Sequence, residues 1–499
     1  MLDSALQGLL CILAPRFLCV MIAGIIIGLI FGVIPAISGL TLLVLALPII
    51  YGMDPMYSLP LILACTSISV IGGAITAILI NIPGDTPNAA TLFDGFPMTQ
   101  KGQAGRALGA ALTGGGLGGL LSALLAFVSI PLVAPIVLAF HMSELFFTVI
   151  LGLVFIGVLS EENKIKGLIS GCLGLLLAFV GVQATTGISR YDFGINYLIG
   201  GISLVPVTMG LFAGSELIEL AVSGKPITQI TSETSFRQMF IGFKDVFRNR
   251  WLWLRCVIIG FIVGVIPGVG QTVAVFIAYG QAKQTSKYPE KFGTGVVEGV
   301  LAPETANNAE LGGALLTTLA FGIPGNGPMA LLLAAFVLTG VRPGPEMLTQ
   351  HLTLSFTIIW ALAIAYIIAA IIAFFTAPFL MKVTRLHPHY LQAVILPVIF
   401  VASFTVDKTI DSIILTLVFT GLGLLMKKVG YSRPTFLIGF VLGLLFEQYF
   451  WFAFKLGGPL FFLTPISLCQ IALIIVLLSY SGVRTLFRIL VTRVTTHAT

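Results

Sequence analysis

Long apolar runs dominate this chain, and they restrict it to very few kinds of structure. Residues 17–34, 360–375 and 471–480 lie in apolar stretches long enough to cross a bilayer core, which takes about 20 residues. The chain is 57% hydrophobic and 9% charged, whereas a soluble domain is about one quarter charged. The alternating polarity of membrane strands is not visible. The sequence therefore predicts an all-α polytopic membrane protein with about 11–12 transmembrane segments.

Two helix-breaking motifs recur in the same order in each half of the chain. "GVIPAISG" begins at Gly32, and "GVIPGVGQ" begins at Gly264. "GGAITAILINIPGDTPNAA" begins at Gly72, and "GGALLTTLAFGIPGNGPMAL" begins at Gly312. Each half thus contains a broken helix and then a small-residue helix that ends at Ile-Pro-Gly. Interrupted apolar segments at corresponding positions of two repeats indicate the binding site of a secondary transporter.

The backbone explains why such breaks suit a binding site. Lipid offers no partner to a free N–H or C=O, so a break is stable only where protein or a water-filled cavity satisfies it. Proline removes one N–H, and glycine permits a sharp turn and close approach of a ligand. A half-helix that begins after Pro-Gly directs unpaired N–H groups and a positive dipole end into the membrane, where a carboxylate binds favourably. The freed carbonyls suit Na⁺. We expect re-entrant-type hairpins at these positions.

Polar and small residues gather at the breaks, and these are the candidate site residues. The residues expected to bind substrate are Ser38, Asn81, Pro83, Gly84, Asp85, Thr86, Asn88, Gly268, Gly270, Gln271, Thr272, Asn307, Asn308, Pro324, Gly325, Asn326 and Gly327. Glu304 and Glu310 border the polar "TANN" stretch, and a carboxylate within a membrane often marks ion coupling. Glu144, Glu216 and Glu219 are weaker candidates for the same role. No catalytic or metal site is predicted, and no cofactor is expected apart from a coupling Na⁺ or H⁺.

The motifs and charges also predict how the chain is divided. We expect a first membrane repeat at residues 1–222, a basic cytoplasmic linker at 223–255, a second membrane repeat at 256–460, and a C-terminal transmembrane helix with a basic tail at 461–499. Basic loops favour the cytoplasmic side, and this rule places corresponding loops of the two repeats on opposite faces. The repeats are therefore predicted to be inverted. The net charge of +6 is scattered over loops and does not indicate a nucleic-acid partner.

Several other interpretations compete with transport. Pro and Gly residues can simply kink transmembrane helices, which tolerate them, but paired breaks in paired order argue against this. A membrane-embedded enzyme acting on lipid-type substrates would need clustered acids, a His/Ser pair or a metal set, and none is evident. An anion channel would also use broken helices around its filter. The sequence contains no GxxxxGK[ST] motif for ATP, and the glycine-rich "TGGGLGG" at residues 113–119 is more typical of close helix packing.

The motifs together resemble the tripartite tricarboxylate transporter family, large membrane subunit (TctA-like permease). The resemblance covers the chain to about residue 460 and depends on "GVIPAISG", "AILINIPGDTPNAATLFDGFPMTQKGQAGRALG", "GVIPGVG" and "EGVLAPETANNAELGGALLTTLAFGIPGNGPMALLLAAFVLTGVRPGP". The sequence departs from the family at "SVIGGAIT", at Ala36 and Ser38, and at the tip "GNGPM", so citrate is not assumed to be the substrate.

The resemblance implies an ion-gradient-driven symporter rather than an enzyme. Members of the family work in the bacterial inner membrane with a small membrane subunit of about four helices. A periplasmic solute-binding protein delivers the carboxylate. By this resemblance the chain imports a di- or tricarboxylate without ATP.

Overall fold

The computed structural model describes residues 1–32, 38–158, 164–183, 186–223, 235–380 and 388–479. The described part is helical apart from one short antiparallel pair of strands, which confirms the prediction of an all-α membrane protein. The chain divides into two compact units, Met1–Pro135 with Ser203–Leu425 and Ile136–Ile202 with Met426–Thr499.

The larger unit contains both pairs of predicted breaks. Its helices up to the first change of unit are α1 (Leu2–Leu13), α2 (Pro15–Gly32), α3 (Gly39–Ile50), α4 (Pro55–Ile80), the 3₁₀ turn η1 (Thr86–Asn88), α5 (Ala89–Gln100) and α6 (Ala104–Leu138). After the chain returns to this unit come α10 (Leu204–Thr208), the π-helical segment η2 (Met209–Gly214), α11 (Ser215–Ser223), α12 (Phe236–Arg248), α13 (Arg250–Val265), α14 (Gly270–Thr285), η3 (Pro289–Lys291), α15 (Glu298–Phe321), α16 (Gly327–Leu338), η4 (Pro345–Leu348), α17 (Leu352–Leu380), α18 (Pro388–Asp407) and α19 (Ile410–Val429).

The smaller unit consists of helices and the strand pair. Its elements are α7 (Met142–Val158), α8 (Lys164–Leu177), β1 (Gly181–Val182), β2 (Ser189–Arg190), α9 (Asn196–Ile199), α20 (Arg433–Gly457), η6 (Gly458–Leu463) and a last helix, Pro465–Ser479. β1 and β2 pair in register Gly181 with Arg190 and Val182 with Ser189.

Five helices of the described residues are long and apolar enough to cross a membrane, and a sixth span results if the bent pair α1 and α2 counts as one. The five are Pro55–Ile80, Ala104–Leu138, Leu352–Phe379, Ile410–Val429 and Arg433–Leu463. Other apolar helices are shorter. α3 and α16 have 12 residues each, so each is roughly 18 Å long and cannot cross a hydrocarbon core of about 30 Å alone. Such half-length helices are what a broken span requires.

Helix starts follow from local sequence. α4 begins with Asp54 as N-cap, whose side chain accepts a hydrogen bond from the Met56 N–H at 2.8 Å, and Pro55 occupies the first turn. α16 and α20 begin in the same way, with Asn326 and Ser432 as N-caps and a proline in the first turn. The N–H groups of the first helical turn have no partner within the helix. A polar cap accepts a hydrogen bond from one of them, and proline has no N–H that needs an acceptor, so both residue types favour a helix start.

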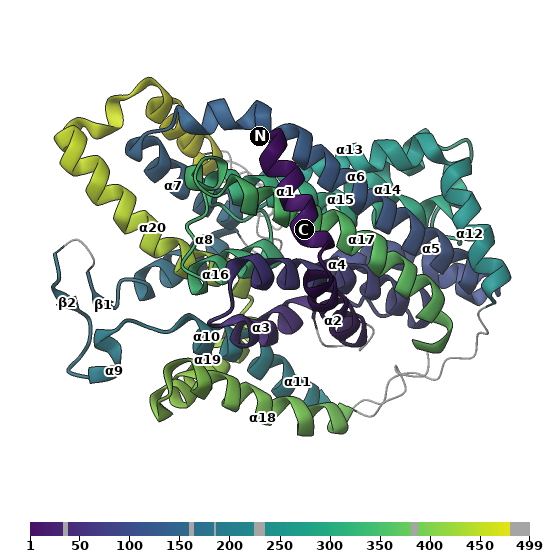
Figure 1. Cartoon of the computed structure of the whole chain (residues 1–499). Helices are drawn as coiled ribbons and strands as arrows, with labels where there is room; N and C mark the ends of the chain where they lie inside the picture. The colour runs from purple at the N-terminus through teal and green to yellow at the C-terminus, as the bar shows by residue number, and fades with distance from the viewer. Residues whose placement is uncertain (33–37, 159–163, 184–185, 224–234, 381–387, 480–499) are drawn as a thin grey trace, which may run out of the picture. The chain divides into compact units, whose positions relative to one another are not determined.

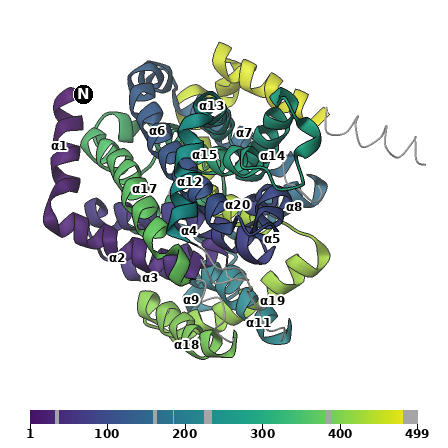
Figure 2. The same cartoon turned by 90° about the vertical axis from the view of Figure 1, so that its right-hand side faces the viewer.

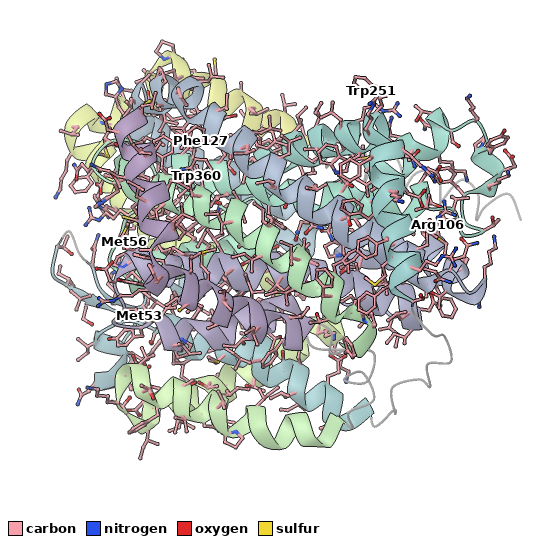
Figure 3. The ribbon with its side chains drawn as sticks, turned by 45° about the vertical axis from the view of Figure 1, so that its right-hand side comes forward. Met53, Met56, Arg106, Phe127, Trp251 and Trp360 are labelled. Carbon is pink, nitrogen blue, oxygen red and sulfur yellow. The ribbon has the colours of Figure 1, made fainter. Side chains whose placement is uncertain are left out.

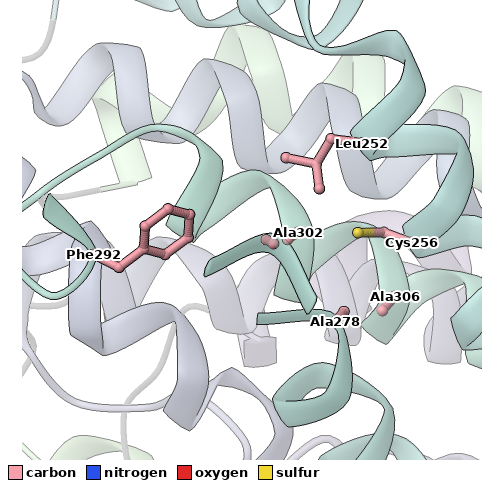
Figure 4. Packing of buried hydrophobic residues seen from close by; sticks show 7 residues of the cluster. Leu252, Cys256, Ala278, Phe292, Ala302 and Ala306 are labelled. Atoms are coloured by element: carbon pink, nitrogen blue, oxygen red, sulfur yellow. The ribbon is translucent and has the colours of Figure 1, made fainter. Parts of the chain in front are cut away.

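α4 and α15, which occupy corresponding places in the two sequence repeats, are the most deeply buried helices of the larger unit. Residues 58–80 of α4 and 299–320 of α15 are all buried. α15 packs closely against α13, where Gly260 and Gly264 lie against its backbone. Figure 4 shows a neighbouring cluster in which small side chains of α13, α14 and α15 meet; its buried members are Leu252, Cys256, Ala278, Ala282, Phe292, Ala302 and Ala306. Small residues allow membrane helices to approach closely.

The first helix of the chain lies alongside α17, as Figures 1 and 2 both show. The indole Nε1 of Trp360 donates to the carbonyl oxygen of Ala5 at 3.1 Å. The Trp360 ring also contacts Phe127 of α6 in a tilted arrangement, with ring centroids 5.3 Å apart (Figure 3).

The compact units do not coincide with the predicted sequence repeats, because the smaller unit takes residues from both. A repeat is defined by sequence similarity rather than by compactness, so the predicted boundaries stay a prediction. Within the predicted linker 223–255, residues 224–234 lie outside the described part, and α12 and the start of α13 form most of the rest.

Candidate functional site

The two Ile-Pro-Gly breaks have the same local geometry. Asn81, which follows α4, has a φ of 57°, and Gly322, which follows α15, has a φ of 68°. Both are left-handed C-caps that immediately precede Ile-Pro-Gly, and Asn and Gly are the residues that adopt this conformation most readily. The sequence repeat is therefore also a repeat of backbone conformation.

The residue after each Pro-Gly caps the next helical segment. The side chain of Asp85 accepts a hydrogen bond from the Thr86 N–H at 2.9 Å, and the Asn88 side chain accepts from the Asp85 N–H at 3.2 Å. Asn326 accepts from the Met329 N–H at 2.8 Å. These polar side chains hold the first turn after each break in place.

Glycine is required at both tips because neighbouring backbone lies very close. A Cβ on Gly84 would lie 2.8 Å from Thr76 Oγ1 and 2.9 Å from the carbonyl oxygen of Gly73. A Cβ on Gly325 would lie 3.1 Å from the carbonyl oxygen of Gly264. The tip at Gly84 is therefore packed onto α4, the helix that leads into it, and the tip at Gly325 is packed onto α13.

The break between α13 and α14 is joined to the second Ile-Pro-Gly break. The N–H of Gly268 donates to the carbonyl oxygen of Gly325 at 3.1 Å. Gly268 and Gly270 have φ of 77° and 75°, a region that L side chains rarely adopt. Gln271, in the first turn of α14, donates to the carbonyl oxygen of Asn307 at 3.3 Å. Thr272 lies beside it, half-buried.

The corresponding break in the first half is only partly described. Residues 33–37, including Pro35, lie outside the described part. Ser38 follows them and caps α3 by accepting from the Thr41 N–H at 3.3 Å. A Cβ on Gly39 would lie 3.2 Å from Asp85 Oδ2, so this break also lies against the Ile-Pro-Gly break of its own half.

A carboxylate of the protein already occupies the start of α3. Glu216 of α11 accepts hydrogen bonds from the Ser38 N–H at 3.3 Å and from the Ser38 hydroxyl at 3.0 Å, and it also accepts from the Thr41 hydroxyl. From the sequence, Glu216 is only a weak candidate for ion coupling. Its intramembrane charge was the available signal, but nothing local in the sequence links it to Ser38.

The two halves contact one another reciprocally at the breaks. η1, from the second break of the first half, packs against α14 of the second half, and α16 packs against α3. A Cβ on Gly327 would lie 3.0 Å from Leu40 Cδ2. Each Ile-Pro-Gly segment thus meets the half-helix that follows the other half's first break.

α15 provides one buried carboxylate to each Ile-Pro-Gly break. Glu304 Oε1 accepts from Asn88 Nδ2 at 3.1 Å and from the hydroxyl of Thr91. Glu310 Oε2 accepts from Asn326 Nδ2 at 2.6 Å. Glu304 is 1% exposed and Glu310 is fully buried. Six residues of α-helix separate them by roughly 9 Å along the axis.

The predicted residues are therefore only partly brought together. Asn88, Gln271 and Asn326 converge on α15, whereas the Asn308 side chain is held by α15's own backbone, donating to the Glu304 carbonyl at 2.9 Å, and faces α6 at Gly115. The two Ile-Pro-Gly tips also differ in solvent exposure. Asn81, Pro83 and Thr86 are exposed, whereas residues 322–326, which contain Pro324, are buried.

Two residues that contribute to the site are not predicted from the sequence. Thr91 follows Asn88 by three residues, so the same face of the chain carries both, and that spacing was the available signal. Asp94 is fully buried and accepts from the N–H groups of Gly295 and Val296 at 2.7 and 2.9 Å, which ties α5 to the loop that leads into α15.

Comparison with known proteins agrees with this architecture. The sequence profile described as "Tripartite tricarboxylate transporter TctA family" matches residues 18–438. A protein of Agrobacterium vitis named "Uncharacterized 52.8 kDa protein in TAR-I ttuC' 3'region" is 32% identical over 437 residues, which cover 85% of this chain and 84% of that protein.

A second protein of Agrobacterium vitis, named "Uncharacterized protein in TAR-II ttuC' 3'region", is 32% identical over 190 residues, which cover 38% of this chain and 78% of that protein. No solved structure matches the chain. The resemblance predicted from the motifs is confirmed: this chain belongs to the tripartite tricarboxylate transporter TctA family, whose members are membrane components of tricarboxylate transporters.

Proposed function

We propose that the chain is the permease of an ion-gradient-driven secondary transporter, a symporter that imports a di- or tricarboxylate. The observation that carries this proposal is the pairing of the breaks. Both Ile-Pro-Gly segments end at polar caps that donate to buried carboxylates of one helix, α15, through Asn88 and Asn326. A lipid-facing kink would need no such partners.

The starts of α14 and α16 are the proposed anion-binding groups. Each directly follows one of the breaks of the second half, and α16 is an apolar helix of half-span length. A helix N-terminus carries about half a positive charge with unpaired N–H groups. The bond from Gly268 to Gly325 links these two starts. We place the substrate carboxylates at the predicted break residues of the two halves, with Asn and Thr side chains completing the contacts.

Coupling to an ion gradient is proposed to act through Glu304 and Glu310. Both carboxylates are buried, and among the described residues neither takes part in a salt bridge. A buried carboxylate without a basic partner is costly unless a cation or a proton neutralises it. Entry of Na⁺ or H⁺ together with the substrate would offset the negative charge of both glutamates.

The remaining parts of the proposal follow from family membership. The chain works with a small membrane subunit of about four helices and a periplasmic solute-binding protein, in the bacterial inner membrane. The reciprocal contacts of η1 with α14 and α16 with α3 support two inverted repeats, at residues 1–222 and 256–460, joined by a cytoplasmic linker.

Uptake of radiolabelled di- and tricarboxylates into proteoliposomes that contain all three proteins tests this function. We expect accumulation above the outside concentration when a Na⁺ or H⁺ gradient is imposed, and Gly84→Val or Gly325→Val should abolish it without loss of protein from the membrane. Gly280→Val in α14 is the matched control, because a Cβ added at Gly280 meets nothing within 4 Å. Passive equilibration without accumulation would favour a channel, and normal uptake by both tip variants would refute the site.

A further inference from the structure

α15 carries five buried oxygen atoms that receive no hydrogen bond within the described part of the structure. They belong to side chains that are at most 1% exposed: Glu304 Oε2, Thr305 Oγ1, Asn307 Oδ1, Asn308 Oδ1 and Glu310 Oε1. A buried acceptor without a donor loses its hydration and gains nothing in return. Several such atoms on one helix therefore indicate that something else binds there.

Contacts with neighbouring elements divide the five side chains between two faces of α15. Glu304, Asn307 and Glu310 follow one another at intervals of three residues, so their side chains form one strip along the helix. Thr305 and Asn308 face α6 instead, where a Cβ on Gly114 would lie 3.1 Å from Thr305 Oγ1 and a Cβ on Gly115 would meet Asn308. We call Glu304, Asn307 and Glu310 the acceptor strip.

The acceptor strip is hydrogen-bonded to both Ile-Pro-Gly breaks. In each glutamate one oxygen accepts a hydrogen bond from a break, from Asn88 for Glu304 and from Asn326 for Glu310, and the other oxygen has no partner among the described residues. Asn307 lies between them, about 4.5 Å of helix rise from each. Its backbone carbonyl accepts from Gln271 of the break between α13 and α14, but its side-chain oxygen has no donor within the part of the chain that the structure describes.

The strip offers three hard oxygen atoms and two carboxylates that pair with no basic side chain among the described residues, and such a set is suited to a cation. We propose that the acceptor strip binds a monovalent metal cation of the sodium class, with Asn307 Oδ1 as its central ligand. This assigns Asn307 to the cation rather than to the substrate. Because each glutamate also holds a break tip, the bound cation fixes Asn88 and Asn326 together. This last step rests on the proposed transport function, whereas cation binding itself does not.

The test uses the purified full-length chain in nanodiscs, without substrate or partner proteins. Thermal unfolding is followed in increasing NaCl, with choline chloride keeping the ionic strength constant. A cation that binds only the folded state raises the Tm as its concentration rises. We expect Na⁺, but not choline, to raise the Tm of the wild type, and Asn307→Ala to raise the half-saturating Na⁺ concentration at least tenfold.

Three further variants make the test specific. Asn307→Asp keeps an oxygen at the ligand position and is expected to retain the Na⁺ response, and Glu310→Gln removes one charge of the strip and is expected to weaken it. Thr305→Val is the matched control: it deletes an equally buried, unpaired oxygen from the same helix, but on the α6 face, and should respond to Na⁺ as the wild type does.

Each outcome decides the assignment. A wild type that Na⁺ and choline affect equally would overturn the metal site, and so would unchanged Na⁺ responses of Asn307→Ala and Glu310→Gln. Equal losses in Thr305→Val and Asn307→Ala would mean that helix packing, not ligation, controls the response. Carboxylate uptake without any Na⁺ stabilisation would overturn the cation site at the acceptor strip and leave the transport function standing. Na⁺ stabilisation without carboxylate uptake would leave the cation site standing and overturn the transport function.

Discussion

Asp94 offers the sharpest test of how α15 is positioned. Its carboxylate is fully buried and accepts from the N–H groups of Gly293, Gly295 and Val296 at 3.0, 2.7 and 2.9 Å, and from the hydroxyl of Tyr279 at 2.8 Å. These donors lie in α14 and in the loop directly before α15. Asp94→Ala would therefore leave the start of α15 without its anchor to α5.

The magnitude follows from the donors that lose their acceptor. Gly293 is exposed, so water replaces the lost bond there, and the half-buried Tyr279 hydroxyl can rotate toward water, whereas the backbone N–H groups of Gly295 and Val296 are fixed and only partly exposed. An unsatisfied buried donor costs about 1–3 kcal/mol, so two of them set the expected loss at about 2–6 kcal/mol. Because water reaches one side of the loop, we expect the lower half of this range.

The assay is thermal unfolding of the purified protein in detergent, where Asp94→Ala should lower the Tm by several degrees. Asp54→Asn is the control: Asp54 is an exposed N-cap, and asparagine caps helices equally well, so its Tm should be unchanged. An Asp94→Ala protein with the wild-type Tm would refute the idea that this carboxylate anchors α15.

Two other contacts give further predictions. In the smaller unit, Arg190→Gln should lower stability by about 1.5–3 kcal/mol, because the guanidinium donates two bonds to Glu447 at 2.7 and 2.8 Å and both side chains are largely buried; an unchanged urea midpoint would contradict this. Glu216→Ala removes the acceptor of the Ser38 N–H and hydroxyl, so hydrogen exchange at the start of α3 should become faster, and unaltered protection there would show that the carboxylate does not hold this helix end.

Much of the local structure could be predicted from the sequence. Ile-Pro-Gly after a small-residue helix identified where α4 and α15 end, because proline cannot continue a helix and the preceding residue must turn. Asp85 and Asn326 are typical caps, and their positions after Pro-Gly indicated new helical segments. These features depend on neighbours within a few residues, so a single sequence is sufficient to recognise them.

The pairing of distant side chains could not be predicted. Asn88 and Glu304 are 216 residues apart, and Ser38 and Glu216 are 178 residues apart. Which carboxylate meets which break depends on how the helices pack, and no local pattern encodes that. The same applies to Asn308, which belongs to a polar stretch beside the break in sequence but faces the glycines of α6 in the fold.

Substrate protection of the first break tests the central claim most directly. Thr86 is exposed at this tip, so Thr86→Cys, in a background without the exposed Cys19, Cys172 and Cys469, should react with a water-soluble maleimide. In vesicles containing the complete transport system, we predict that a transported tricarboxylate slows this labelling at least fivefold, while Thr285→Cys at the far end of α14 labels at an unchanged rate. Equal labelling of Thr86→Cys with and without a substrate that is being transported would contradict a carboxylate site at the paired breaks.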